Sequence, residues 1–280
     1  MSIEHVSLNI AYGKEALQFG DLYLPGDTGP YPVVILIHGG FWRVPYGLAL
    51  MTGLAKDLVR RGIAVWNIEY RRVGDIGGGW PGTLLDVAQA ADYLQKLGEQ
   101  YPLDLQRVVS IGHSAGGHLA LWLAARPQLV AKGWHPLEEK SALAGSQESL
   151  HPTASPIPLK MTGVISLAGA IDLEQVWRLQ LGNEAAADLL GGSPEEVPER
   201  YLIASPAVHV PLGLPQVLIH GTEDDRVPLI VSETYEKRAT AAKDTIRLVV
   251  LDGADHFVLI DATSTAWGII VEELRPLLNY

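Results

Sequence analysis

Residues 108–125, VVSIGHSAGGHLALWLAA, predict a short buried strand that turns sharply into an apolar helix. Val108, Val109 and Ile111 give this stretch the β-branched composition of a buried strand. The leucines and alanines after residue 116 are typical of a helix, which we expect to end before Pro127. Between strand and helix, residues 112–116 read GHSAG and match the pattern G-x-S-x-G.

The GHSAG pattern makes Ser114 a candidate nucleophile. A strand that turns sharply into a helix needs small residues where the two backbones cross, and Gly112 and Gly116 supply them. The turn lifts the Ser114 hydroxyl clear of the sheet and leaves the amide of Ala115 without a partner at the helix N-terminus. Short patterns with two glycines recur by chance, so the alternative is that Ser114 only caps the helix.

Composition favours a single α/β domain over residues 1–280, with 48% hydrophobic residues to form its core. A formal net charge of −11 without a basic block argues against nucleic-acid and anionic-membrane partners. The lack of cysteine excludes disulfides and zinc–thiolate sites. There is no secretory pattern at residues 1–5 and no apolar run of about 20 residues, so we expect a soluble, cytoplasmic protein without membrane contact.

Strand and helix patterns alternate along the chain. Residues 5–12 and 17–24 read as an antiparallel pair. Further strands are expected at 33–37, 63–68, 108–111, 161–167, 215–219 and 245–251, and helices at 47–61, 83–97, 229–242 and 262–278. This order predicts a doubly wound, mostly parallel sheet.

Two segments interrupt the alternation and are expected to form cap or insertion segments within the domain. Residues 126–160 are rich in proline and lack periodicity, which is typical of lids and binding loops. Residues 173–207 read as short helices, one of them capped by Ser193 with Pro194 in its first turn.

Residues that carry chemistry follow four of the predicted parallel strands. Ser114 follows one strand, Asp224 and Asp225 another, His256 the last, and residues 39–40 the first long one. In open α/β sheets, ligands bind at the carboxyl ends of the strands. We therefore expect these residues to converge at one edge of the sheet, with either aspartate as the acid.

The residue types fit nucleophilic catalysis. A serine hydroxyl is a poor nucleophile until a neutral imidazole takes its proton, and a buried carboxylate must hold that imidazole in the right tautomer. Two backbone amides must face the oxyanion that develops. The amide of Ala115 and one from the turn at Gly40 and Phe41 are the candidates, because glycine lets the main chain come close.

Four motifs together resemble those of an α/β-hydrolase, of the esterase and kynurenine-formamidase-like branch. They are HGGFW at residues 38–42, GHSAGGH at 112–118, G-x-x-D-x-x-V-P at 221–228, and His256. The HGGFW turn lacks the third glycine of the hormone-sensitive-lipase type, so the substrate preferences of those enzymes do not carry over.

The resemblance implies roles for particular residues. Ser114 would be the nucleophile and His256 the base, and the motif spacing selects Asp224 as the acid in preference to Asp225. The His-Gly-Gly turn, with Gly40 and Phe41, and the amide of Ala115 would form the oxyanion hole. No metal and no organic cofactor is implied.

Several other residues have a functional and a structural interpretation. Trp42, Trp80 and Trp177 either line an apolar substrate pocket or pack in the core. Asp172 is interpreted as a turn residue more readily than as an alternative acid.

The remaining histidines are expected to be structural or exposed. His113 and His118 are five residues apart and therefore not on one helical face, which argues against a metal site. His38 is expected to order its own loop by hydrogen bonds, and His220, at the start of the acid loop, is expected to be structural. His5, His135, His151 and His209 are expected at the surface.

These observations predict a serine hydrolase that cleaves a carboxylic ester or aryl amide of a small substrate through an acyl-enzyme. Its rate should fall at acidic pH as His256 becomes protonated. The alternatives are a kynurenine formamidase, an acylaminoacyl-type peptidase, and a non-catalytic ligand-binding homologue. The peptidase is disfavoured because no propeller-sized segment exists, and the ligand-binding homologue because all three triad positions have candidates.

Overall fold

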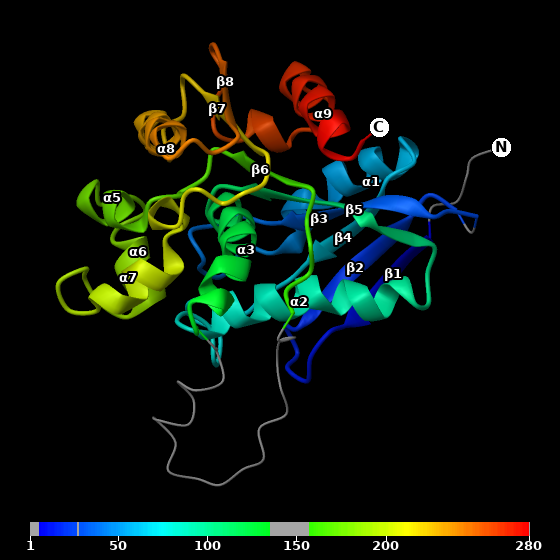
Figure 1. Cartoon of the computed structure of the whole chain (residues 1–280), viewed down its shortest axis with the longest axis horizontal. Helices are drawn as coiled ribbons and strands as arrows, with labels where there is room; N and C mark the ends of the chain where they lie inside the picture. The colour runs from blue at the N-terminus through cyan, green and yellow to red at the C-terminus, as the bar shows by residue number, and fades with distance from the viewer. Residues whose placement is uncertain (1–5, 27, 135–156, 280) are drawn as a thin grey trace, which may run out of the picture.

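The computed structural model describes residues 6–26, 28–134 and 157–279. In this part of the chain an eight-stranded sheet has the order β1-β2-β4-β3-β5-β6-β7-β8 (Figure 1). Its strands are β1 Val6–Ala11, β2 Phe19–Leu24, β3 Tyr31–Ile37, β4 Ala64–Ile68, β5 Leu103–His113, β6 Gly163–Leu167, β7 Gln216–Gly221 and β8 Ile246–Leu251. The β1–β2 and β2–β4 pairs are antiparallel and the other pairs are parallel. The prediction of a doubly wound, mostly parallel sheet is confirmed.

Helices cover both faces of this sheet. They are α1 Thr52–Arg60, α2 Gly82–Gly98, α3 Ala115–Ala131, α5 Leu173–Arg178, α6 Ala185–Leu190, α7 Pro198–Ala204, α8 Ile230–Ala241 and α9 Thr265–Leu277. Short 3₁₀ helices lie at Leu48–Met51, Pro206–Val208 and Val258–Ile260. Helices α1 and α9 pack on one face, while α2, α3 and α8 pack on the other (Figure 1).

Strand β3 shows why the sheet needs two helical layers. Val33, Ile35 and Ile37 join the apolar cluster under α2 and α3, whereas Val34 and Leu36 join the cluster under α1 and α9. All five side chains are fully buried. Successive side chains of a strand point to opposite faces, so a continuous apolar run is stable only where both faces are covered.

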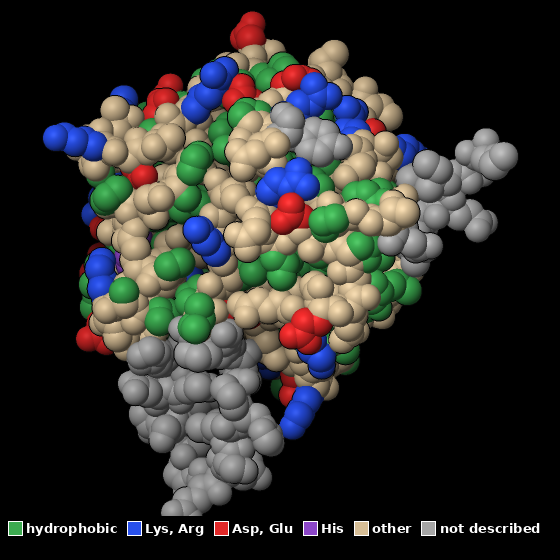
Figure 2. All heavy atoms as spheres, turned by 45° about the vertical axis from the view of Figure 1, so that its right-hand side comes forward, with side chains coloured by type: hydrophobic (Ala, Val, Ile, Leu, Met, Phe, Trp, Pro, Cys, Tyr) green, Lys and Arg blue, Asp and Glu red, His purple; other side chains and the backbone are tan. Residues whose placement is uncertain are grey.

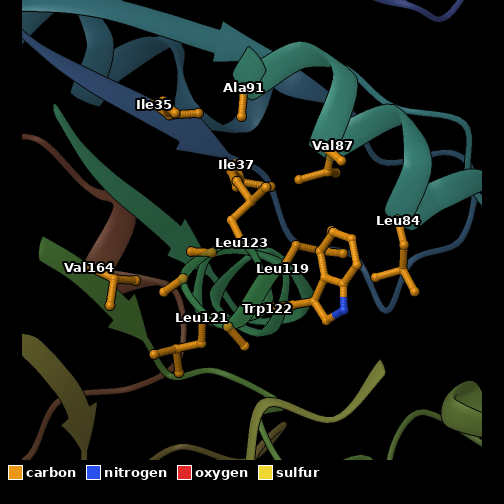
Figure 3. Close-up of a cluster of buried hydrophobic side chains, with 14 of the residues drawn as sticks. Ile35, Ile37, Leu84, Val87, Ala91, Leu119, Leu121, Trp122, Leu123 and Val164 are labelled. Atoms are coloured by element: carbon orange, nitrogen blue, oxygen red, sulfur yellow. The ribbon is translucent and has the colours of Figure 1, made fainter. Parts of the chain in front are cut away.

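Helix α3 is buried on nearly all sides. Figure 3 shows Leu119 and Trp122 of this helix between Ile37 of β3 and Leu84 of α2. The Trp122 indole N–H also donates to the carbonyl of Ile203, at 3.1 Å. A helix that is apolar all round belongs in a core, and its N-terminus is therefore held firmly in place.

The prediction that this helix ends before Pro127 is wrong. Helix α3 continues through Pro127 to Ala131. Leu129 in the last turn is buried, and its carbonyl accepts a hydrogen bond from the Trp134 amide at 3.0 Å. Tertiary packing of this turn outweighs the local cost of proline, which is about 3 kcal/mol.

The two predicted insertions differ in outcome. Residues 126–131 belong to α3 and not to an irregular segment, and residues 135–156 lie outside the described residues. The short helices expected at 173–207 are present as α5, α6 and α7. Ser193 caps a turn through reciprocal hydrogen bonds with Glu196, and the next helix begins only at Pro198.

Charged side chains are mixed on the surface. On the face that Figure 2 shows, Lys and Arg side chains are interspersed with Asp and Glu. No helix within the described residues combines the length and the apolar character that crossing a bilayer requires. The expected absence of nucleic-acid and membrane partners stays a prediction.

His118 links α3 to the loop after β3 and is fully buried. Its Nδ1 accepts the indole N–H of Trp42 at 3.2 Å, and its Nε2–H donates to the carbonyl of Ala204 at 2.8 Å. The bond from Trp42 requires the neutral ring, because a protonated Nδ1 cannot accept, whereas the Nε2–H donates in either form. Burial lowers the pKa of His118 to about 4.

We predict that His118 makes the fold sensitive to mild acid. A histidine in the unfolded chain titrates near pH 6.5, so the stabilisation is complete above that pH and is lost as pH falls toward 4. From pH 7 to pH 5.5, urea unfolding of the His118→Gln variant should lose less free energy than wild type, by on the order of 1 kcal/mol. Equal losses in the two proteins would contradict this.

Candidate active site

Ser114 lies at the sharp turn between β5 and α3. Its backbone has φ 56° and ψ −120°, a conformation that costs a non-glycine residue of order 1–3 kcal/mol. Its side chain makes no capping hydrogen bond to α3. The alternative that Ser114 only caps the helix is therefore wrong, and the strained turn instead presents the hydroxyl at the carboxyl edge of the sheet.

The turn depends on glycine at two positions. A Cβ atom at Gly112 would lie 1.9 Å from the carbonyl oxygen of Gly116, and one at Gly116 would lie 2.1 Å from that of Ile37. Both contacts are with backbone, which cannot rotate away. The expectation that small residues are needed where the backbones cross is confirmed.

Gly116→Ala should therefore destabilise the fold by about 3 kcal/mol or more, because β3 and α3 must move apart. The matched control is Gly268→Ala on α9, where a Cβ meets nothing within 4 Å. That substitution should stabilise by about 0.5–1 kcal/mol, since alanine favours the helix. Urea midpoints measure both, and similar values for the two variants would refute the backbone contact.

His256 and Asp224 meet beside this turn. The Nδ1–H of His256 donates to Oδ2 of Asp224 at 2.6 Å. The other carboxylate oxygen, Oδ1, accepts the amides of Arg226 and Val227 at 2.9 and 2.8 Å. The Asp224 side chain is fully buried, whereas that of Asp225 is 71% exposed. Of the two candidate acids, only Asp224 contacts the imidazole.

The carboxyl group of Asp224 is held in its ionised form. Burial by itself would raise the pKa of Asp224, but hydrogen bonds from His220 and His256 outweigh burial and hold the pKa well below its usual range. His220 is fixed in turn by Ser232, whose hydroxyl lies 2.8 Å from Nδ1, and by the Val227 carbonyl, 2.7 Å from Nε2. The expected structural role of His220 is confirmed.

Ser114 and His256 open onto one pocket of about 150 Å³, which we call the Ser114 pocket. Its apolar wall consists of Phe41, Tyr46, Leu50 and Phe257. Within the described residues the Ser114 hydroxyl makes no hydrogen bond. Hydrogen bonds of catalytic groups are often long until substrate binds, so the shared pocket, and not a hydrogen bond, joins the two residues.

The HGGFW turn borders the same pocket through Gly40 and Phe41. Gly40, Phe41 and Trp42 have φ values of 111°, 50° and 56°, so three successive residues are left-handed. A Cβ at Gly39 would lie 2.9 Å from that of Ser114. The turn therefore lies directly against Ser114. Ala115, the first residue of α3, follows Ser114 in the chain.

His38 holds this turn in place. Its ring lies 2.8 Å from the Gly39 carbonyl through Nδ1 and 2.8 Å from Oε1 of Glu69 through Nε2. Burial would raise the pKa of Glu69, but the contact with His38 and two backbone amides lower it. The side chain is therefore a carboxylate that accepts these hydrogen bonds. The ring also stacks on Tyr70, whose hydroxyl donates to the His38 carbonyl at 2.9 Å. The expectation that His38 orders its own loop is confirmed.

The tryptophans expected near the pocket lie elsewhere. Trp42 is fully buried against His118, and Trp80 and Trp177 pack on the core cluster, so none of the three lines the Ser114 pocket. The core interpretation is correct for Trp42, because its ring fills the space between the turn and α3. The aromatic walls come instead from Phe41, Tyr46 and Phe257.

His113 is a site residue that the sequence did not reveal. Its Nε2–H donates to the backbone carbonyl of His256 at 2.9 Å, and the two rings lie 4.5 Å apart. Burial, together with neighbouring His256, lowers the pKa of His113 to about 3, so the ring stays neutral. The only sequence signal was its position next to Ser114, because the partner is 143 residues away.

Other predicted residues have structural roles or fall outside the site. Asp172 caps α5 by accepting the Gln175 amide at 3.2 Å. His209 was expected at the surface but is buried, with Nε2 3.3 Å from the Ile203 carbonyl. His5, His135 and His151 lie outside the described residues. Within the described residues, no group of three or more His, Asp or Glu side chains is arranged so that it could hold a metal ion.

The parallel sheet, the strained serine turn and the imidazole on a buried carboxylate define an α/β-hydrolase. More narrowly, the BD-FAE family model matches residues 20–238, and the chain belongs to the BD-FAE family. The resemblance seen in the four motifs is confirmed.

Individual relatives are enzymes of ester and formamide hydrolysis. The chain is 29% identical over 260 residues to the probable isoprenylcysteine alpha-carbonyl methylesterase ICME of Oryza sativa subsp. japonica, across 89% of this chain and 57% of that protein. It is 26% identical over 244 residues to kynurenine formamidase avaC of Aspergillus versicolor, across 75% and 76%. The chain thus spans little more than half of the rice relative.

A solved structure shows the same fold. Esterase B of Lactobacillus rhamnosis superimposes with a TM-score of 0.76 over 98% of this chain and 85% of that one, at 21% identity. At this identity the likeness concerns the architecture alone.

Proposed function

We propose that this protein is a serine hydrolase that cleaves a carboxylic ester of a small substrate through an acyl-enzyme. Ser114 is the nucleophile, His256 the base and Asp224 the acid that orients it. The observation that carries the proposal is the 2.6 Å hydrogen bond from His256 Nδ1 to buried Asp224, beside the pocket that Ser114 shares with His256.

The reaction proceeds in two halves. Ser114 Oγ attacks the substrate carbonyl carbon while its proton passes to His256 Nε2. The tetrahedral intermediate collapses, the bond to the leaving group breaks, and His256 gives that group the proton. Water, activated by the same imidazole, then attacks the acyl-enzyme and releases the acid. Throughout, Asp224 stays ionised and keeps the proton of His256 on Nδ1.

The oxyanion would be stabilised by backbone amides. The Ala115 amide is the first of α3 and has no partner within the helix. An amide from the left-handed turn at Gly40 and Phe41 is the second donor. Each such donor contributes about 3–4 kcal/mol in a known case, and the His38–Glu69 contact keeps the second one in position.

Pocket size limits the substrate. A space of about 150 Å³ next to Ser114 accommodates a short acyl group or one aromatic ring. The aromatic walls favour an apolar or aryl group. Small aryl esters therefore fit better than long-chain lipids.

Kynurenine formamidase activity is the second candidate. The similarity to avaC, which covers 76% of that protein, favours it. A formyl group is the smallest acyl group, and the aromatic walls could hold the aryl amine. Rapid hydrolysis of N-formylkynurenine together with poor activity on phenyl acetate would show that the protein is a formamidase and not an esterase.

We expect Ser114→Ala to lower kcat for phenyl acetate by at least about 10⁴-fold, because no other group can form the acyl-enzyme. A fluorophosphonate probe should label wild type at residue 114, seen by mass spectrometry of the peptide. The control is Ser193→Ala, on the turn before α7, which should keep full activity and labelling. Unlabelled wild type would favour the non-catalytic ligand-binding homologue.

Asp224→Asn should lower kcat by about 10⁴-fold, because the imidazole then loses the partner that fixes its tautomer. Asp225→Asn should change kcat by less than about twofold, since that side chain faces solvent. The low pKa of Asp224 keeps the carboxylate ionised in mild acid, so protonation of Asp224 should not limit wild-type activity there. If Asp225→Asn were the inactive variant, the acid would be reassigned.

A further inference from the structure

One lining residue of the Ser114 pocket has no role in the proposed chemistry. Arg226 lies at this pocket, and it is the only Lys, Arg, Asp or Glu among the described residues that line it. The other walls are aromatic, aliphatic, glycine, serine and histidine. A guanidinium in such surroundings is the strongest fixed charge that a bound molecule would meet.

The backbone of Arg226 is held by the proposed triad. Its amide donates to Oδ1 of Asp224 at 2.9 Å, while Oδ2 of the same carboxylate accepts from His256. The Cα of Arg226 is therefore fixed relative to the imidazole. A group that the side chain binds therefore lies within reach of the proposed triad.

The guanidinium itself makes only a weak ion pair. Its ion pair is with neighbouring Asp225, through Nε at 3.3 Å, and the two side chains are 55% and 71% exposed. Exposed pairs of this kind contribute little, and salt screens them. The planar fork of an arginine can still bind a carboxylate through two parallel hydrogen bonds.

We propose that Arg226 is a specificity residue that binds a carboxylate on the substrate. This inference rests on the proposed ester hydrolysis and narrows its substrate class to small aryl or acyl esters that carry a carboxylate. The ring would occupy the walls formed by Phe41, Tyr46 and Phe257, and the carboxylate would meet the guanidinium at the pocket mouth. Because the protein has a net charge of −11, a local cation is needed to favour an anionic substrate.

The test compares two esters that differ by one carboxylate, 4-acetoxybenzoate and phenyl acetate. In Arg226→Gln the ratio of kcat/KM for the anionic ester to that for the neutral ester should fall about tenfold. Arg226→Lys should retain part of the ratio, because it keeps the charge but loses the fork. The wild-type ratio should also decline in 0.5 M NaCl.

Arg275→Gln is the matched control, because Arg275 is 50% exposed and pairs only within its own helix, with Glu272 at 3.3 Å. Its ratio should equal that of wild type. An unchanged ratio in Arg226→Gln, or an equal fall in Arg275→Gln, would overturn the proposal.

Binding of benzoate separates this inference from the proposed function. Calorimetry should give a Kd about tenfold higher for Arg226→Gln than for wild type. If wild type hydrolysed neither ester, the proposed function would fail, but benzoate binding would still test whether Arg226 binds a carboxylate. Equal benzoate affinity in the two proteins would refute the role of Arg226.

Discussion

The crossing of backbones at the end of β5 is the constraint on which the candidate site depends. Helix α3 passes so close to β5 and β3 that neither Gly112 of β5 nor Gly116 of α3 has room for a Cβ atom. The chain can meet this contact only by a sharp turn, which places Ser114 in a left-handed conformation. Because the HGGFW turn continues from β3, the same contact brings it against Ser114. Backbone packing thus positions both the hydroxyl and the proposed oxyanion donors before any side chain acts.

Buried histidines restrain the two loops of the site that backbone packing alone does not fix. His38 fastens the turn after β3 through the Gly39 carbonyl and Glu69, and His113 fastens the loop of His256 through that residue's carbonyl. A ring nitrogen that donates to a backbone carbonyl restrains a loop without adding bulk. Burial keeps His113 neutral, so this restraint adds no positive charge beside His256.

The main errors of sequence interpretation have a common cause. Trp42 was a candidate pocket residue, Pro127 a helix stop and His209 a surface residue, and the structure places all three differently. Each assignment relied on local context or on the usual preference of a residue type. In each case packing against distant segments outweighed that preference. Trp42, for example, contacts His118, which is 76 positions further along the chain. Local preference amounts to only about 1–3 kcal/mol per residue, which one buried side chain can outweigh.

Local patterns were enough to specify the alternation of strands and helices and the glycines of the serine turn. They also specified the chain order of Ser114, Asp224 and His256. These features depend on backbone sterics and periodicity within a few residues. Which aromatic rings form the pocket and where Arg226 lies were decided only in the folded chain. Those contacts join segments that are tens to hundreds of residues apart. No periodicity within one segment encodes the direction in which a loop side chain points once the strand ends have converged.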